Sequence, residues 1–400
     1  MRLTLSGWVF LGVGIALLVA AYLTNFAGLR AIGILTLALP ASSLLVLNWR
    51  RNLPLAHLIV QPLEALPGAP VSVGQLARIV VALRNPDLRP ASGARLTLQM
   101  SPSLGPAVMA TSSVLGPGEA QDLEHTIRPT TRGQFELGPL TAEMYGPFSL
   151  CRRRLTLISS YPVLVGPRLH RLSDAGALSS RRNAEEQHRM QQGNGTHDFT
   201  SRSYQVGDDL RHVHWPSTAR HGELMVRQEA NADIRRITVF LDSAVSSYQH
   251  ADDFEWMVSA ASSATTHFAQ GGYEVELHTQ DGHAGTFGGG GDPTHSIAAA
   301  HRTFAGIELT DRAYVTSTAT PLRHEQLGSA VRLAFLGSDG AEQQAITHGL
   351  SARSTADSLE LAFVAGPANE EATSGFTLQP VISSDRVDQA WISLLERLDQ

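Results

Sequence analysis

Two apolar runs near the N-terminus restrict what this chain can fold into more than any other feature. GWVFLGVGIALLVAAYL covers residues 7–23, and AIGILTLALPASSLLVLNW covers residues 31–49. Neither run contains a charged residue, and each approaches the ~20 residues that an α-helix needs to cross a bilayer. We therefore expect a hairpin of two transmembrane helices, with Trp8 and Trp49 near opposite ends of the hairpin as interfacial anchors.

The charges around these runs predict how the hairpin is oriented. Arg2 precedes the first run, Arg50 and Arg51 follow the second, and the connecting turn contains only Arg30. The positive-inside rule therefore places both termini in the cytoplasm. A cleavable signal peptide is the competing interpretation of the first run, but a second apolar run follows at once and favours the hairpin. The sequence thus predicts a two-pass protein of the inner or plasma membrane, with the bulk of the chain in the cytoplasm.

The hairpin, residues 1–50, is followed by three regions of different character. Residues 51–158 contain short apolar runs separated by Gly- and Pro-rich turns, which is typical of an immunoglobulin-like β-sandwich. Residues 159–231 include the polar stretch SSRRNAEEQHRMQQGNGTHDF and are expected to be a linker with an embedded motif. Residues 232–400 alternate strands with amphipathic helices, which predicts an α/β domain with a mainly parallel sheet. The expected fold is therefore multi-domain.

Charge, cysteine content and motifs argue against several classes of function. The net charge of -6 argues against general nucleic-acid binding. The single cysteine, Cys151, excludes an intramolecular disulfide framework and a multi-cysteine zinc site. The GGGG run at 288–291 lacks the lysine and the preceding strand of a phosphate-binding loop. No Ser-His-Asp, nucleotide-binding or redox motif stands out, so the sequence predicts a protein that is not an enzyme.

One polar stretch, RSYQVGDDLRHVHWPSTAR at residues 202–220, invites either a catalytic or a structural interpretation. Asp208 and Asp209 are adjacent, so in an extended segment they point to opposite sides and do not form an acid/base pair. Two histidines two positions apart leave a zinc site open as an alternative. The residue types better fit a structural clasp, in which the carboxylates pair with arginines and Trp215 is an apolar anchor between the charges.

The order of these regions resembles a bacterial family that contains the domain of unknown function 58. Its signature runs roughly R-x-Y-x-x-G-D-D-x-R-x-I-x-W-x-x-S/T-A-R. The matching residues here are Arg202, Tyr204, Gly207, Asp208, Asp209, Arg211, Val213, Trp215, Thr218, Ala219 and Arg220. Pro216 departs from the signature, because the family usually has a basic residue there. The end of the sandwich is also similar to the family pattern D-P-F-G-L, but Gly146 replaces the acid and Ser149 replaces the glycine.

The resemblance implies a von Willebrand factor A-like fold for the α/β domain. In that fold D-x-S-x-S after the first strand, with a Thr and an Asp from other loops, holds a divalent cation, for which Mg²⁺ is suited. Asp242 and Ser246 match the first motif, Ala244 replaces its first serine, and Asp339 matches the distal aspartate. Thr294 is a candidate for the threonine. We therefore expect a degenerate Mg²⁺ site, with capping of the loop and of the following helix as the alternative role of Asp242 and Ser246.

The resemblance also implies a function. Proteins of this family are associated with MoxR-type AAA+ ATPases, and some with transglutaminase-like membrane proteins. The chain is therefore expected to be a membrane-anchored, non-enzymatic adaptor or chaperone-like partner of such an ATPase. The alternatives are a metal-dependent hydrolase or cell-wall-associated enzyme that uses the acidic loop residues, and a purely structural anchor.

Overall fold

The computed structural model describes residues 2–49, 53–63, 70–173, 200–203, 215–228, 236–290, 292–312, 329–351, 359–366 and 375–398. They form two compact units. The first unit contains the helical hairpin and the sheets that follow it and extends to Gly166, while the second begins at Pro167. The first unit ends beyond residue 158, the expected end of the sandwich, because strand β11 (Tyr161–Gly166) also belongs to it.

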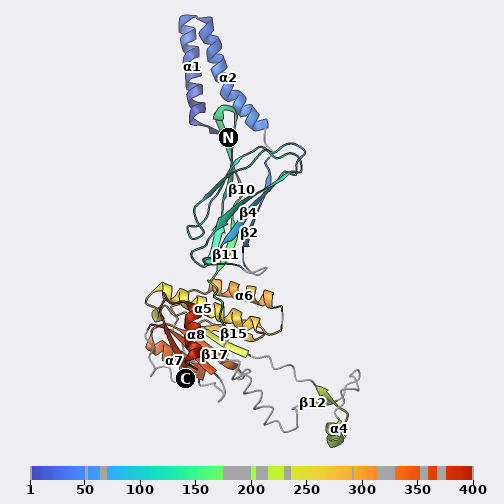
Figure 1. Ribbon diagram of the computed structural model, residues 1–400. Coiled ribbons are helices and arrows are strands. Elements are labelled where there is room, and N and C mark those ends of the chain that lie inside the picture. Colours follow the sequence, from blue (N-terminus) through green and yellow to red (C-terminus); the bar gives the residue numbers. More distant parts are fainter. Residues whose placement is uncertain are drawn as a thin grey trace. The chain divides into compact units, whose positions relative to one another are not determined.

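Helices α1 (Leu5–Thr24) and α2 (Ala27–Trp49) form the hairpin predicted from the apolar runs (Figure 1). Each is long and apolar enough to span a bilayer, with a mean hydropathy of 2.0 for α1 and 1.9 for α2. Asn25 ends α1 in the left-handed conformation, with φ 51°. Trp8 and Trp49 lie at the same open end of the hairpin rather than at opposite ends as predicted, because the two helices run in opposite directions. They are 60% and 81% exposed. These two helices are compatible with membrane anchoring.

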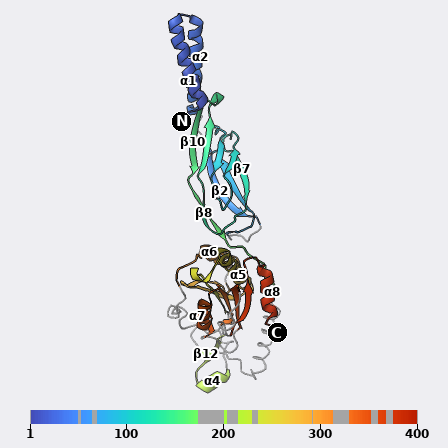
Figure 2. The ribbon, with the colours of Figure 1, turned by 90° about the vertical axis from the view of Figure 1, so that its left-hand side faces the viewer.

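Besides the hairpin, the described part of the first unit contains three small sheets (Figure 2). Their strand orders are β1-β10-β9-β5-β6, β2-β4-β7 and β3-β11-β8. The strands are β1 (Arg2–Leu3), β2 (Leu55–Pro62), β3 (Val71–Ser72), β4 (Ala77–Arg84), β5 (Arg95–Leu98), β6 (Val108–Thr111), β7 (Ala120–Ile127), β8 (Gly133–Leu137), β9 (Leu140–Tyr145) and β10 (Cys151–Ile158). Strand β4 buries every second residue, and its Ile79 and Leu83 share one core with Leu96 of β5 and Leu140 of β9. The sheets therefore pack on one another around a common core.

A six-stranded sheet forms the centre of the second unit, in the order β16-β15-β14-β17-β18-β19. All neighbouring strands are parallel except the edge strand β16, which is antiparallel to β15. The strands are β14 (Arg236–Leu241), β15 (Glu274–Thr279), β16 (Gly282–Gly288), β17 (Ser329–Leu336), β18 (Leu359–Ala365) and β19 (Thr377–Val381). The helices are α5 (Ala251–Gln270), α6 (Pro293–Gly306), α7 (Gly340–Ser351) and α8 (Val387–Glu396).

Alternate residues of the central strand β14 pack against different helices. Val239 and Leu241 belong to the core that includes α5, α6 and α8, whereas Phe240 belongs to the core with Ile346 and Leu350 of α7. This alternation follows from the two-residue period of a strand. The second unit is therefore a three-layered α/β domain with helices on both faces of its sheet (Figure 1).

A short hairpin precedes the central sheet in the chain. Strand β12 (Thr200–Ser203) pairs in antiparallel fashion with β13 (Met225–Gln228), and helix α4 (Trp215–His221) lies between them in the sequence. Part of the stretch predicted as the clasp thus belongs to regular elements rather than to a linker.

Candidate functional site at the carboxyl ends of the strands

The carboxyl ends of β14 and β17 form the switch point of the sheet. From β14 the chain continues to β15 and β16 on one side, and from β17 it continues to β18 and β19 on the other. Ligands of open α/β sheets bind outside the strand carboxyl ends at such a point. Asp242 directly follows β14, and Gly337 directly follows β17. The residue predicted as the main cation ligand therefore lies where this fold favours a binding site.

Donors of the protein itself bind the Asp242 carboxylate, which is completely buried. Oδ1 accepts hydrogen bonds from the Ala244 N–H, at 3.0 Å, and from Nε2 of Gln280. Oδ2 accepts from the Gly337 N–H at 3.1 Å. Oε1 of Gln280 in turn accepts from the N–H of Ser243, at 2.5 Å, and from its hydroxyl, at 2.8 Å. Gln280, which follows β15, thus connects its own loop to the loop after β14.

Burial sets the protonation equilibria of this loop. It raises the pKa of the Asp242 carboxyl, and the hydrogen bonds from the Ala244 and Gly337 N–H groups partly oppose the effect. Burial, with the nearby charges of Asp242 and Asp253, also raises the pKa of Tyr248 well above its usual value. Tyr248 therefore stays neutral, and its hydroxyl donates to the Asp242 carbonyl at 2.7 Å. Hydrogen bonds from Ala244 and Tyr248 to Asp242 therefore join residues within the same loop, which we call its closed state.

The other predicted cation ligands have different roles. Ser246 is exposed. Oδ1 of Asp339 accepts from the Ala341 N–H at 3.0 Å, so Asp339 caps the first turn of α7. Within the described residues no group of three or more His, Cys, Asp or Glu side chains could hold a metal ion. Asp242 and Asp339 thus both accept hydrogen bonds from the protein itself, and their role with Ser246 as Mg²⁺ ligands stays a prediction.

Thr310, rather than Thr294, is the threonine beside the Asp242 loop. The Thr310 N–H donates to the Ser243 carbonyl at 2.7 Å, and the Thr310 carbonyl accepts from the Val245 N–H at 2.9 Å. Its hydroxyl accepts from the Arg312 N–H at 3.4 Å. Thr294 lies instead in the first turn of α6. Sequence spacing carries no signal for Thr310, because the loop after α6 reaches Asp242 only through the fold.

The predicted clasp lies largely outside the described residues. This applies to Tyr204, Gly207, Asp208, Asp209 and Arg211, whose pairing stays a prediction. Arg202 belongs to β12, where it is opposite Val226. Trp215 begins α4 and is 69% exposed, and Arg220 near the end of the same helix is also exposed. The exposure of Trp215 differs from the buried apolar anchor that the clasp hypothesis requires.

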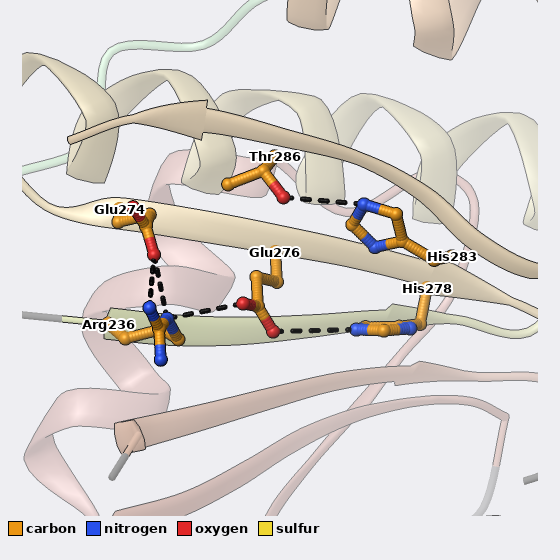
Figure 3. A network of polar contacts seen from close by, with 6 residues as sticks. All are labelled: Arg236, Glu274, Glu276, His278, His283 and Thr286. Carbon is orange, nitrogen blue, oxygen red and sulfur yellow. Dashed lines mark hydrogen bonds and ion pairs between the residues drawn. The ribbon is translucent and has the colours of Figure 1, made fainter. Parts of the chain in front are cut away.

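A second polar cluster lies along one face of β15, beside the edge of the sheet (Figure 3). Glu274, Glu276 and His278 alternate along this strand and therefore share a face. Nη2 of Arg236 is 2.6 Å from Oε1 of Glu274, and Nε of Arg236 is 3.2 Å from Oε1 of Glu276. Nε2 of His278 lies 3.8 Å from Oε2 of Glu276, and its ring is 5.2 Å from that of His283, measured between centroids. These contacts link β14, β15 and β16.

Burial and neighbouring side chains shift the pKa values of two members of this cluster, Glu276 and His283. The contact with His278, and then the charge of Arg236, lower the pKa of Glu276 against the effect of burial. Burial and the neighbouring His278 lower the pKa of His283. The run EVELH indicates that three polar side chains share one face of a strand, but it does not reveal Arg236, which is 38 positions from Glu274. The cluster stabilises the sheet edge and presents no activated nucleophile.

Residues 200–292 match the model of the family DUF58, a protein family of unknown function. Over these residues the chain is similar to the DUF58 family. The match begins at β12, covers the signature at 202–220, and continues through the Asp242 loop, α5, β15 and β16. It therefore contains most of the residues that form both polar clusters of this protein. No curated protein matches the chain.

Several solved structures resemble part of this protein. A solution structure of the CARDB domain of PF1109 from Pyrococcus furiosus is 18% identical, covers 28% of this chain and 96% of that chain, and has a TM-score of 0.19. A crystal structure of the same domain with di-metal ions is also 18% identical, with 28% and 94% covered and a TM-score of 0.17. The alkylpurine DNA glycosylase AlkC from Pseudomonas fluorescens is 17% identical, with 27% and 29% covered and a TM-score of 0.17. These scores are too low to support an argument about fold or activity.

Proposed function

We propose that this protein is a membrane-anchored, non-enzymatic adaptor or chaperone-like partner of a MoxR-type AAA+ ATPase. On this proposal its α/β domain is a von Willebrand factor A-like domain with a degenerate cation loop, and it acts through protein–protein contacts from the cytoplasmic side of the inner or plasma membrane. A transglutaminase-like membrane protein is a further candidate partner. The proposal rests on the family resemblance and on one structural observation, the closed state of the Asp242 loop.

That observation supports a binding role for the loop. The Ala244 N–H, the Gly337 N–H and the Gln280 amide bind the Asp242 carboxylate. A general acid or base must reach the proton that it transfers, and a metal ligand must present a free lone pair to the cation. The buried Asp242 carboxylate accepts three hydrogen bonds from the protein, which supports a structural role in holding one conformation of the loop.

The exposed part of this loop is a suitable contact surface for a protein. Val245 is 45% exposed, and Ser246 beside it is also exposed. The Val245 N–H donates to the Thr310 carbonyl at 2.9 Å, and the Ser338 N–H donates to the Ser247 carbonyl at 2.6 Å. A surface with a fixed backbone loses little conformational entropy when a partner binds. Val245 therefore marks the proposed contact.

Capture of the purified ATPase by the full-length protein in lipid nanodiscs tests this proposal. Val245→Asp places a charge in the proposed contact and should weaken capture at least about tenfold, because an unpaired charge is costly in an interface. Ile392→Asp is the matched control, since Ile392 is a β-branched residue on α8 with 43% exposure. Failure of the wild-type protein to capture the ATPase in the presence of ATP would refute the adaptor function. Equal losses in both variants would instead exclude Val245 as the contact.

The metal-dependent hydrolase, or cell-wall-associated enzyme, is distinguished by a separate measurement. It requires the Asp242 carboxylate to bind a cation. Calorimetric titration of Mg²⁺ and Zn²⁺ into the full-length protein should give no heat that Asp242→Asn abolishes. Stoichiometric binding lost in that variant, together with a hydrolytic activity, would favour the enzyme over the adaptor.

A further inference from the structure

The turn between β9 and β10, residues 146–150, contacts the open end of the helical hairpin (Figure 1). The Thr4 N–H donates to the Leu150 carbonyl at 2.9 Å, and the Thr4 hydroxyl donates to the Ser149 carbonyl at 2.6 Å. On the other helix, the Ser43 hydroxyl donates to the Pro147 carbonyl at 3.2 Å. The turn is thus bonded to the residue that caps α1 and to a residue of α2.

Two glycines permit this approach. A Cβ atom on Gly7 of α1 would lie 2.2 Å from the Leu150 carbonyl oxygen, and one on Gly146 would lie 2.4 Å from the Ser43 hydroxyl oxygen. Real Cβ atoms do not come so close to other heavy atoms, so a side chain at either position would push the turn away. The backbone of the turn therefore lies directly against both helices, at the position along the hairpin that is marked by Gly7 and Ser43.

That position coincides with the expected edge of the hydrocarbon core. The 20 residues of α1 follow the cap residue Thr4, and the first turn of this helix, including Gly7, is level with the turn at residues 146–150. At 1.5 Å per residue these residues span about 30 Å, the thickness of the bilayer's hydrocarbon core. Toward its C-terminus α2 passes Ser43 and buries Leu47 in the core of the sandwich. The turn therefore lies where the apolar spans end and the folded body begins.

The turn exposes a large aromatic side chain at this level. Phe148 is 77% exposed and has a left-handed backbone, with φ 56° and ψ 17°. Both features are unfavourable for a bulky residue in water. Trp8, one turn into α1, is 60% exposed near the same end of the hairpin. Arg2 and Arg152, opposite one another on β1 and β10, are also exposed, and such an aromatic–arginine mixture is typical of the membrane interface.

We propose that the turn at residues 146–150 is a third membrane-contacting element, in which the Phe148 side chain inserts among the lipids at the boundary between head groups and acyl chains. The occupant of this surface is the bilayer itself. Insertion removes the exposed Phe148 ring from water. The left-handed backbone conformation of Phe148 belongs to the turn that presents this ring. The inference rests on the hairpin spanning the membrane, as the proposed function does.

Depth measurements with a fluorescent probe test the inference. The variants Phe148→Cys, Val13→Cys and Leu88→Cys are each labelled with NBD in the full-length protein and placed in nanodiscs that contain doxyl-labelled lipids. Val13 lies within α1, and Leu88 is a sandwich residue with 92% exposure. The native Cys151 is completely buried, and the unsubstituted protein controls for its labelling. Nanodiscs that each hold one copy of this protein prevent a second copy from shielding the probe.

The expected pattern differs at the three positions. The probe at residue 148 should show blue-shifted emission and stronger quenching by doxyl groups near the lipid carbonyls than by those in mid-chain. The probe at residue 13 should show the opposite preference, and the probe at residue 88 should be quenched only by aqueous iodide. If residue 148 behaves as residue 88 does, the inference is wrong. If residue 13 also escapes lipid quenching, the hairpin does not span the bilayer and the membrane-anchored function fails with it.

Discussion

At the scale of single residues, the hydrogen-bond partner decides what an ionisable side chain can do. Asp242 occupies the sequence position of a cation ligand, but Gln280 from the end of another strand binds its carboxylate. A glutamine side chain can accept and donate at the same time, so Gln280 serves Ser243 and Asp242 together.

His301 on α6 provides a test at the same scale. It is 1% exposed, and neither of its ring nitrogens has a hydrogen-bond partner among the residues described. Burial lowers its pKa from 6.5 to about 4. Between these values the unfolded chain binds a proton that the folded chain does not bind, so the stability of the α/β domain is lost as the pH falls through this window. The loss is on the order of 3 kcal/mol, at 1.36 kcal/mol for each pKa unit.

Comparison with His301→Leu isolates this contribution. Urea unfolding of both full-length proteins, at pH 7 and at about pH 4, should show the variant gaining stability relative to the wild type as the pH falls. Other titrating groups are common to the two proteins and cancel in the difference. Parallel pH dependences in the two proteins would contradict the assignment of this loss to His301.

At the scale of elements, the contact between the hairpin and the turn at residues 146–150 explains one of two departures from the family pattern. Gly146 stands where the family has an acid, and the adjacent Ser43 leaves no room for a side chain there. Ser149 stands where the family has glycine, and its φ of 54° is the left-handed conformation that glycine adopts most readily. The first departure fits the close packing of α2, whereas the second retains a backbone strain that glycine would relieve.

Substitution of two glycines in α1 tests the importance of this contact. Gly7→Ala places a methyl group 2.2 Å from the Leu150 carbonyl oxygen and should lower the melting temperature of the first unit by several degrees. Gly12→Ala is the matched control, because a Cβ at Gly12 meets no heavy atom within 4 Å. That change should be neutral or stabilising, since alanine favours a helix by about 1 kcal/mol over glycine. Thermal unfolding of the full-length protein in detergent measures both, and equal effects would exclude the contact.

At the scale of the whole molecule, each unit has a hydrophobic core built from its own residues. Leu83 of β4 is completely buried in the core of the first unit, and Phe363 of β18 is 1% exposed in that of the second. Large-to-small substitutions in such cores cost about 2–5 kcal/mol, because they remove apolar burial and leave a cavity. Each cost should therefore fall on the unit that contains the substitution.

Scanning calorimetry of the full-length protein in detergent measures this separation. Leu83→Ala should lower only the transition of the first unit, and Phe363→Ala only that of the second. Each shift should be about 2–4 °C per kcal/mol for units of this size. A single transition that both substitutions lower equally would show that the two units unfold together.

Some elements of the α/β domain carry little sequence signal. Strand β16 has the sequence GHAGTFG, and glycine has a low preference for strands. Helix α7 begins with glycine, and Ile346 and Leu350 are its members of the hydrophobic core with Phe240. Pairing with β15 and packing on the sheet stabilise these two elements. Tertiary contacts thus supply what local propensity does not.

The sequence by itself determined the helical hairpin, the change from short strands to alternating strands and helices, and the position of the family signature. These features follow from hydrophobic periodicity, turn residues and spaced motifs, which are local properties of the chain. It also placed Asp242 at the end of a buried strand, where this class of fold favours a binding site.

Only the tertiary structure decided the state of that site and the level of the turn at residues 146–150. The Gln280–Asp242 bond joins residues 38 positions apart, and the Thr4–Leu150 contact joins residues 146 positions apart. Such contacts depend on strand order and on how closely two backbones can approach. The spacing of residues in the sequence contains information on neither property. The sequence motif therefore identified Asp242 but did not reveal that Gln280 binds its carboxylate.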